Sequence, residues 1–465
     1  MADLTWNVPG KVDLILGAQL FPYIYLGNRV ESGTNAPPAL LTTLGYVLMG
    51  DVPKVSSVHT FTGFALNDTL QKVRELEELP RVEYMSPEET ECESVFTSSV
   101  SRDVCGHYSV TLPFYRSLSE LGNSEAIALS RFMVLERKLN HTPELENSYN
   151  TAIYDYIDNG YLSEIPQSDI HIEGYYIPHH AVVRSDKPLP RIILDSSVKI
   201  HTGLSLNDLL HVGPNLQADL FLLLLDFRLF PVALIADVEQ IYLQIGIPED
   251  DRKYLRNLFR FNTNEDISTF QFNRLLFALK SSPFLAMRIV RQLAEDISHE
   301  FPEAAAVVKS CKFYMDDLVH SVVNNEIAIS LSQHMVSMFK AGSFDLVKWS
   351  SNSSMVLQHL PDSYRSPVVF SKGENVPKVL GLTREPTDDN FVVTVCDFFG
   401  KCTKRHIISI IARLFEVLGL IAHVILYAKL LIKGLWLCEV DWDGTSPEDM
   451  IRRLRLLRDL PCYLI

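Results

Sequence analysis

The sequence lacks the cysteine patterns and long apolar runs of disulfide-rich, zinc-binding and membrane-spanning proteins. Its seven cysteines are scattered and include no Cys-x-x-Cys pair, so we expect a reducing cytosol or nucleus, with neither a zinc site nor a disulfide framework. The longest apolar stretch, residues 417–437, is interrupted by His423, Lys429 and Lys433, which predicts a buried helix and not a membrane span. Residues 1–10 are polar, so we expect no signal peptide and no membrane partner.

An excess of positive charge is also lacking. Lys and Arg total 42 against 57 Asp and Glu, which gives a formal net charge of −15. This balance disfavours tight non-specific binding of nucleic acid, so an enzyme acting on nucleic acid would need a locally basic channel. With 47% hydrophobic and 21% charged residues among its 465, the chain is predicted to be globular and long enough for more than one domain.

Two adjacent aspartates, Asp316 and Asp317, lie in the apolar, β-prone run 312–319. Neighbouring side chains of a strand point to opposite faces, so both carboxylates serve one site only if the chain turns there. We therefore predict a β-hairpin whose first strand ends at Tyr314 and whose tight turn is Met315-Asp316. Such a turn holds a carboxylate at the rim of a sheet, within reach of a divalent cation. The alternative is an ordinary Asx turn.

A second carboxylate is needed, because one aspartate is too little to hold a catalytic Mg²⁺. The candidate is Asp237, which ends a strand-like apolar run in residues 232–242, 79 residues before Asp316 (316 − 237). Tyr242 follows five residues later and places an aromatic ring beside the predicted metal site.

Residues 12–50 are predicted to form short strands at 12–18, 23–27 and 44–50, separated by Gly and Pro turns. Residues 15–21 resemble the last segment of retroviral-type aspartic proteases, in which a glycine lets a strand pass beneath the active-site loops. Such enzymes present their catalytic carboxylate on an Asp-Thr/Ser-Gly turn, and this tripeptide is absent here, so protease activity is not expected. An unrelated β segment is the alternative.

Residues 60–170 carry helical spacing of apolar residues and acidic runs without obvious chemistry, which predicts a helical connector. The segments 175–184 and 191–195 then predict a β-hairpin with Arg184 and Arg191 near its inner ends. Two converging guanidinium groups suit a triphosphate, whereas isolated surface charges are the alternative.

Two further patterns predict local geometry. His179 and His180 are adjacent on a predicted strand and face opposite ways, so we do not expect them to share a metal ion. Residues 277–283 turn from a strand into a helix, for which Ser282 suits the cap and Pro283 the first helical position. A helix that begins beside a carboxylate pair can pack against a template or a nucleotide.

The order of these parts resembles the fingers and palm of a retroelement reverse transcriptase, and in detail the Bel/Pao family of long-terminal-repeat retrotransposons. The parts are an arginine-bearing hairpin, an Asp at a strand end, an aromatic five residues later, Phe-x-x-x-Ser-Ser-Pro before a helix, and Tyr-Met-Asp-Asp. Further matching strings are residues 176–183, 205–208, 212–217, 344–352, 379–382, 403–409, 412–415 and 441–443. The resemblance covers nearly the whole chain.

This resemblance implies an α+β fold with the right-hand fingers, palm and thumb of a polymerase, preceded by a β-rich segment. Residues 1–55 would be the C-terminal remnant of a retropepsin-like aspartic protease, and residues 56–165 the helical connector. Residues 166–345 would form the fingers and palm. Residues 346–465 would form the end of the palm and a thumb- or connection-like region, truncated before ribonuclease H.

The family's functional residues carry over to matching positions. Asp237 and Asp316 would bind two Mg²⁺ ions, or Mn²⁺ in their place, with Asp317 beside them and the backbone carbonyl of Val238 as a further ligand. The resemblance further implies that Arg184 and Arg191 bind the triphosphate and that Tyr242 excludes a 2′-hydroxyl. Phe277 and Met315 would line the nucleotide and primer pocket. Lys348 would donate a proton to pyrophosphate, and Gly381 and Leu382 would grip the primer end.

The implied activity is that of an RNA-directed DNA polymerase, which transfers a nucleotide from a dNTP to a primer 3′-hydroxyl. The implied partners are an RNA or DNA template with primer, dNTPs and other segments of the Pol polyprotein, in the cytoplasm (within a virus-like particle) or the nucleus. Ala278, Leu194 and Thr383 stand where the family usually has glycine, an aromatic and tryptophan. These departures leave open an alternative, a catalytically dead relic or a co-opted module that binds nucleic acid or protein.

Overall fold

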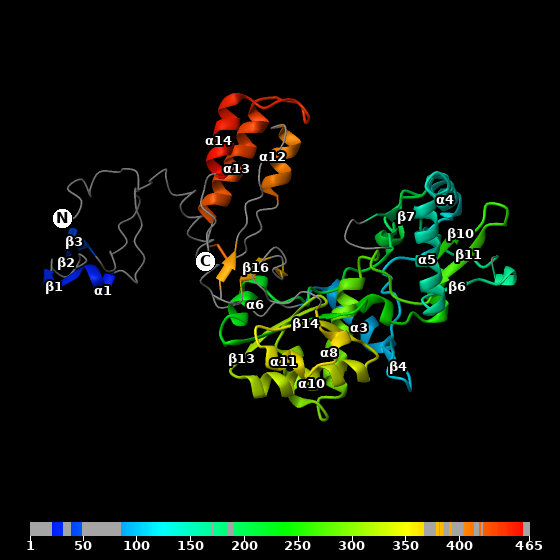
Figure 1. The fold of residues 1–465 in the computed structure, drawn as a ribbon, viewed down its shortest axis with the longest axis horizontal. Coiled ribbons are helices and arrows are strands. Elements are labelled where there is room, and N and C mark those ends of the chain that lie inside the picture. Colours follow the sequence, from blue (N-terminus) through cyan, green and yellow to red (C-terminus); the bar gives the residue numbers. More distant parts are fainter. Residues whose placement is uncertain are drawn as a thin grey trace, which may run out of the picture. The chain divides into compact units, whose positions relative to one another are not determined.

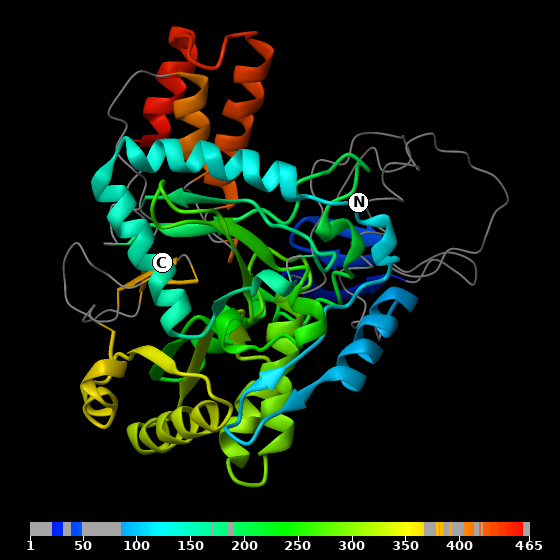
Figure 2. The same cartoon turned by 90° about the vertical axis from the view of Figure 1, so that its right-hand side faces the viewer.

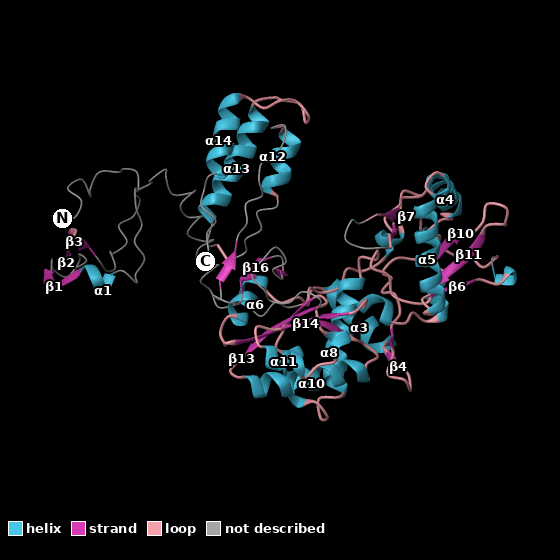
Figure 3. Cartoon of the chain, viewed as in Figure 1, coloured by secondary structure: helices cyan, strands magenta, loops and turns pink. Residues whose placement is uncertain are grey.

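The structure is a computed structural model that describes residues 21–30, 39–48, 85–169, 171–183, 189–366, 378–380, 382–385, 390–392, 403–412, 418–419 and 422–458. The chain divides into two units, Met1–Tyr84 and Met85–Ile465, and each is described by itself. Figures 1 and 3 show their helices and strands. The predictions for Arg184, Gly381 and the strand at 12–18 lie outside the described residues.

The described part of unit Met1–Tyr84 is a small antiparallel sheet. Its elements are α1 (Phe21–Ile24), β1 (Tyr25–Val30), β2 (Ala39–Thr42) and β3 (Gly45–Leu48), with strand order β1-β2-β3. The hydroxyl of Thr42 donates a hydrogen bond to the carbonyl of Gly45 (2.8 Å) and so closes the β2–β3 turn. The strands predicted at 23–27 and 44–50 overlap β1 and β3.

Unit Met85–Ile465 begins with three helices that share one core with the elements after them. The helices are α3 (Pro87–Ser99), α4 (Glu125–Asn140) and α5 (Pro143–Asp158), and the short strands β4 (Ser101–Arg102) and β5 (Tyr108–Ser109) pair between α3 and α4. Ser86 caps α3, because its hydroxyl accepts from the N–H of Glu89 (3.2 Å) while the Glu89 carboxylate accepts from the N–H of Ser86 (2.7 Å). Phe96, Phe132 and Tyr149, one from each helix, are buried in the shared core.

Two small sheets lie next to α4 and α5. One has the order β10 (Arg256–Phe259), β11 (Ser268–Phe272), β6 (Leu162–Glu164), and in the other β7 (His179–Val182) pairs with β8 (Arg191–Leu194). Figure 2 shows α4 and α5 (cyan) alongside these strands. The β7–β8 pair is the predicted hairpin. Within β7, His179 is buried and His180 exposed, which confirms that the two histidines face opposite ways.

A four-stranded antiparallel sheet carries the predicted aspartates. Its order is β12 (Phe313–Tyr314), β13 (Asp317–Val322), β9 (Val232–Val238), β14 (Leu346–Ser350). Side chains alternate along β9, so Leu234 and Ala236 enter the main core, whereas Ala233 and Ile235 lie on the opposite face.

Helices cover both faces of this sheet. The main-core face packs against α10 (Asn325–Ala341), with α8 (Ser282–Asp296) and α9 (Pro302–Lys309) in the same core, and the other face packs against α6 (Leu220–Phe227). Figure 1 shows α8 and α10 on one side of β13 and β14 and α6 on the other. Because α6 is short, it covers only part of its face.

The remaining elements lie mostly toward the C-terminal end. They are α7 (Glu249–Arg252), α11 (Ser354–Gln358), the sheet β15 (Lys378–Val379), β16 (Leu382–Glu385), β17 (Asn390–Val392), and the helices α12 (Lys404–Ile411), α13 (Ala422–Leu437) and α14 (Glu448–Arg458). Helices α12, α13 and α14 have a core of their own, built from Ile407, Ile411, Val424, Ala428, Leu431, Leu435 and Met450.

The predicted buried helix at 417–437 is present as α13, but the expected burial is wrong. Leu426, Leu430 and Leu437 are 59%, 55% and 76% exposed, because among the described residues α13 meets its neighbours through the face that carries Val424, Ala428, Leu431 and Leu435. Among the described residues, no helix combines the length and the apolar character needed to cross a membrane.

Candidate metal centre

The predicted hairpin at the aspartate pair is present. Strand β12 ends at Tyr314, which pairs with Asp317 across the two-residue turn Met315-Asp316. Met315 has a φ of 57°, as the first turn residue of a type II′ hairpin does, and a non-glycine residue there costs about 1–2 kcal/mol. The N–H of Val238 donates to the carbonyl of Asp316 (2.8 Å), which ties this turn to the end of β9.

Three carboxylates converge at this end of the sheet. Asp237 and Asp317 are direct partners in the β9–β13 ladder, and Asp316 precedes them in the turn. Asp237 lies two residues after Ile235 in β9, and Asp317 lies two residues before Val319 in β13. Side chains two residues apart in a strand share a face, so both carboxylates lie on the α6 face of the sheet. One carboxylate oxygen from each aspartate lies within 4.8 Å of the others, a donor set that suits a hard divalent cation.

Mutual repulsion and burial disfavour three negative charges in this cluster. Burial, followed by the charges of Asp316 and Asp237, raises the pKa of Asp317 to about 6. The pKa of Asp316 is also raised, by burial first and by Asp237 second. A bound cation would relieve both effects, so the electrostatics agree with the geometry.

Lys348 supplies the positive charge that the structure holds against this cluster. Its Nζ lies 2.5 Å from Oδ2 of Asp237. The β14–β9 register shifts between Val347 and Ser350, and Lys348 has a φ of 53°, so a β-bulge sets its direction. Only the family resemblance predicted that Lys348 lies near the site. The structure shows that the bulge brings Lys348 into contact with Asp237.

Tyr242 lies beside the same cluster. It belongs to the 3₁₀ turn Ile241–Gln244 that follows β9, and its side chain is half-buried. Burial first and the charge of Asp316 second raise the pKa of the Tyr242 hydroxyl to about 12. The side chain of Val238 is 1% exposed in the main core, so only its backbone carbonyl is left to serve the cluster.

The other predicted residues make separate contacts. The guanidinium of Arg191 lies 5.0 Å from the centre of the Phe277 ring, and Sδ of Met315 accepts a hydrogen bond from Gln217 (2.7 Å). Arg191 is exposed at the start of β8. Leu382 begins β16, where it pairs with Val379.

The helix predicted after Phe277 begins one residue early. Ser281, not Ser282, is the N-cap of α8, and Ser282 is already helical. The Ser282 hydroxyl donates to the carbonyl of Leu276 (2.5 Å), so this side chain ties the helix start to the preceding segment and does not cap it. Pro283 falls within the first two helical positions, as proline does in many helices.

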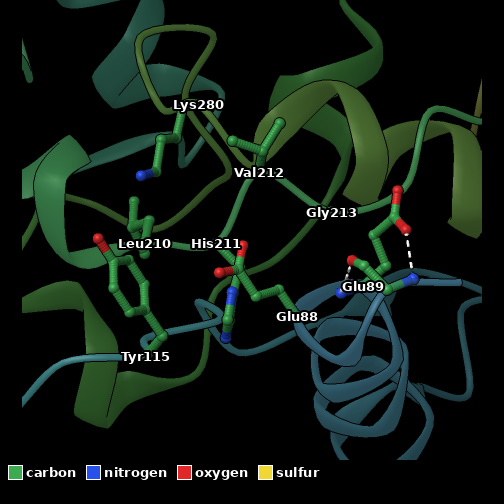
Figure 4. Close-up of a pocket in the computed structure, with 9 residues that line it drawn as sticks. Glu88, Glu89, Tyr115, Leu210, His211, Val212, Gly213 and Lys280 are labelled. Carbon is green, nitrogen blue, oxygen red and sulfur yellow. Dashed lines mark hydrogen bonds between the residues drawn. The ribbon is translucent and has the colours of Figure 1, made fainter.

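Sequence reasoning missed a polar pocket next to this segment (Figure 4). The pocket has a volume of about 520 Å³ and is lined by Ser86, Glu88, Glu89, Tyr115, Leu210, His211, Val212, Gly213 and Lys280. His211 is 6% exposed, and its Nε2 lies 3.4 Å from Oε2 of Glu91. Burial lowers the pKa of Lys280, whose Nζ lies 5.3 Å from the ring centre of Tyr115. These segments are far apart in sequence, so no local pattern could have found the pocket.

One comparison with known families gives a match. Residues 403–459 match the model of the Pao retrotransposon-like RNaseH-like domain. The matched segment contains α12, α13 and α14, and it lies within the region 346–465. The match supports a relationship of the chain to the Pol region of Pao retrotransposons. A search of curated proteins finds no match.

Proposed function

From this relationship to Pao retrotransposon Pol, we propose that the chain is an RNA-directed DNA polymerase with a right-hand fold. The four-stranded sheet with its flanking helices would be the palm, and the sheets beside α4 and α5 the fingers. The observation that carries the proposal is the convergence of Asp237, Asp316 and Asp317 within 4.8 Å at one end of the palm sheet.

The carboxylate cluster fits two Mg²⁺ ions, or Mn²⁺ in their place. Asp237 and Asp316 would hold the ions, with Asp317 and the backbone carbonyl of Val238 completing the protein ligands. The chemistry such ions supply when bound is activation of the primer 3′-hydroxyl and neutralisation of charge on the leaving pyrophosphate. Lys348, already in contact with Asp237, is the residue that we assign as proton donor to the pyrophosphate.

The substrate would be a primer on an RNA or DNA template, with dNTPs as nucleotide donors. Tyr242 would stack below the sugar and exclude a 2′-hydroxyl, while Arg184 and Arg191 would bind the triphosphate. Phe277 and Met315 would line the nucleotide and primer pocket. Gly381 and Leu382 would hold the primer end.

The backbone at Ala278 supports a working site. Where the family usually has glycine, alanine would be strained if φ had to be positive, but Ala278 does not lie in the positive-φ region. Its carbonyl accepts a hydrogen bond from the side chain of Asn207 (3.0 Å), which holds the segment in place. The alanine therefore fits the backbone conformation at this position.

The test is primer extension on poly(rA)·oligo(dT) with Mg²⁺. We expect extension by the wild type and its loss, by at least about a thousandfold, in the Asp316→Asn variant, because the cluster then lacks one metal-binding charge. Manganese binding, followed by electron paramagnetic resonance, should weaken in the same variant. This second readout reports on the metal site without requiring turnover.

Asp155→Asn is the matched control, since Asp155 is exposed on α5 and belongs to a different element. It should extend primers at the wild-type rate. Equal extension by wild type and Asp316→Asn would refute the assignment of the cluster. A folded wild type that binds manganese but extends no primer would favour the dead relic or the co-opted binding module.

A further inference from the structure

A second polar pocket, of about 330 Å³, lies at the β4–β5 hairpin and contains none of the three aspartates. Its wall includes Arg252, from the end of α7, and Arg274, which follows β11. Both side chains are half-buried. The pocket thus places two cationic groups from separate elements around one hollow.

The two guanidinium groups lack the partners that buried charges require. Among the described residues, neither Arg252 nor Arg274 forms an ion pair with a carboxylate. Nε of Arg252 donates to the carbonyl of Ile247 (2.8 Å), and Nε of Arg274 is buried with no hydrogen-bond partner among the residues that the structure describes. Burial lowers the pKa of Arg274, and the charge of Arg252 acts in the same direction, whereas Tyr161 and Asp103 act in the opposite direction. Such a pair is costly unless an anion joins it.

The rest of the lining favours an anion that accepts hydrogen bonds. Ser101, Ser109 and His107 line the same pocket, and their side chains carry groups that can donate to an oxyanion. One carboxylate, Asp103, is also present. It accepts the N–H groups of Cys105 (2.8 Å) and His107 (2.9 Å), which engages its oxygen in the hairpin turn.

The backbone around the pocket is held before any ligand binds. The N–H of Leu275 donates to the carbonyl of Ile245 (2.9 Å), and the N–H of Ile247 donates to that of Asn273 (3.0 Å). These bonds fix the segment that carries Arg274 beside the one that leads to Arg252. A preorganised pair of guanidinium groups loses little freedom on binding, which favours affinity.

We propose that this pocket binds the phosphate group of a small molecule, either inorganic phosphate or a phosphate monoester. Two guanidinium groups match a phosphate dianion, because each binds two oxygens through parallel N–H donors. A phosphate within a nucleic-acid strand carries a single charge and would leave one guanidinium uncompensated. The pocket is separate from the carboxylate cluster, and the proposal does not depend on polymerase activity.

The test is titration of the full chain with inorganic phosphate, by calorimetry and by thermal unfolding at constant ionic strength with chloride as the reference. We expect saturable binding and a rise in the unfolding temperature. Arg274→Gln and Arg252→Gln should each weaken binding by roughly tenfold or more, since each removes a charge-assisted contact. Glucose 6-phosphate, as a second probe, distinguishes a monoester site from one for free phosphate alone.

Arg137→Gln is the matched control, because Arg137 is exposed on α4 and its Nε also donates only to a backbone carbonyl, that of Met133 (3.1 Å). It should bind phosphate like the wild type. Ser109→Ala is a milder pocket variant that keeps the test valid if an arginine variant does not fold, and it should weaken binding several-fold.

Three results would overturn the proposal. The first is a wild type that phosphate neither binds nor stabilises. The second is equal phosphate affinity in the wild type, Arg274→Gln and Ser109→Ala. The third is displacement of phosphate by an oligodeoxynucleotide without terminal phosphates as effectively as by glucose 6-phosphate, which would point to a strand as the ligand.

Discussion

The hydrogen bonds of the buried residue His179 define its protonation state. Nε2 lies 2.9 Å from the carbonyl of Leu258, which only accepts, so Nε2 carries the proton. Nδ1 is then free to accept from the hydroxyl of Tyr149 (2.6 Å). Both ring nitrogens are satisfied in the neutral state, and burial lowers the pKa of His179 to about 4.

This lowered pKa predicts a specific acid sensitivity. An unfolded histidine takes up its proton near pH 6.5, whereas His179 in the fold resists protonation to about pH 4. The contribution of neutral His179 to the free energy of unfolding is therefore fully present above pH 6.5. It is lost as the pH falls toward 4, which lowers the free energy of unfolding by about 3 kcal/mol. Urea unfolding across this pH range should show the loss in the wild type and in His180→Gln, where only the exposed neighbour changes. His179→Gln should start less stable at pH 7 and lose less on acidification; equal acid losses in all three proteins would contradict the assignment.

Tyr242 gives a prediction about sugar selection, which rests on the proposed polymerase function. Replacing Tyr242 by valine removes the ring beside the carboxylate cluster, so ribonucleotides should be incorporated roughly 10–200-fold better relative to deoxynucleotides. Competitive primer extension with dTTP and UTP measures the ratio. Phe277→Leu is a suitable comparison, because it alters the proposed pocket elsewhere and should leave sugar selection unchanged. Unchanged selection in Tyr242→Val would remove this residue from the gate.

At the scale of elements, one glycine fixes how the segment before α6 meets α8. Gly213 has a φ of +81°, and a Cβ there would lie 2.4 Å from Cγ of Phe284, a core residue that is 3% exposed. Gly203 has nearly the same φ, +78°, but a Cβ there would meet no atom of the described residues within 4 Å. Substitution of Gly203 therefore introduces backbone strain alone, whereas substitution of Gly213 introduces backbone strain and steric overlap.

The matched substitutions Gly213→Ala and Gly203→Ala should differ accordingly. Gly203→Ala should cost about 1–2 kcal/mol of unfolding free energy, from the left-handed backbone alone. Gly213→Ala should cost a further 1–3 kcal/mol or so, because the methyl group overlaps the Phe284 ring in a packed core. Denaturant unfolding of both variants gives the difference. Equal losses would mean that Phe284 moves aside without cost.

The sequence predicted those elements whose local pattern settles their geometry. The Met315-Asp316 turn follows from two acids in one strand-like run, and the opposite burial of His179 and His180 follows from strand alternation. The contact of Lys348 with Asp237 could not be predicted from the sequence, because the bulge in β14 contains no glycine, proline or asparagine that would indicate it. The exposed face of α13 was missed for a different reason: an apolar helix is covered only where a neighbour packs against it.

At the scale of the molecule, the hydrophobic clusters predict where the chain can be divided. The main core draws its buried residues from Cys92 to Leu360, whereas α12, α13 and α14 bury their own cluster between Ile407 and Met450. A smaller cluster under α6 also touches Leu380 and Leu418, so the separation is incomplete. Most of the apolar burial of the candidate catalytic part nevertheless lies within residues 85–366.

We therefore expect a fragment of residues 85–366 to fold without the C-terminal helices. Circular dichroism should show one cooperative thermal transition, and manganese binding by the carboxylate cluster should persist. The shorter fragment 85–341 is the control, since it lacks β14 and with it the edge strand that carries Lys348. If 85–366 showed no cooperative transition, the contacts of Leu380 and Leu418 would be more important than the division of the clusters implies.

The pairing of Asp237 with Asp317 has a consequence for how the metal centre can vary. The two residues are cross-strand neighbours, so backbone hydrogen bonds fix their Cβ separation at about 4.5–5.5 Å. Substitutions that loosen the core will lower stability long before they alter this dimension. Only a change of register would separate the carboxylates, because a slip of one residue turns a side chain to the other face. The distance between the two carboxylates is therefore set by the main-chain pairing of β9 and β13.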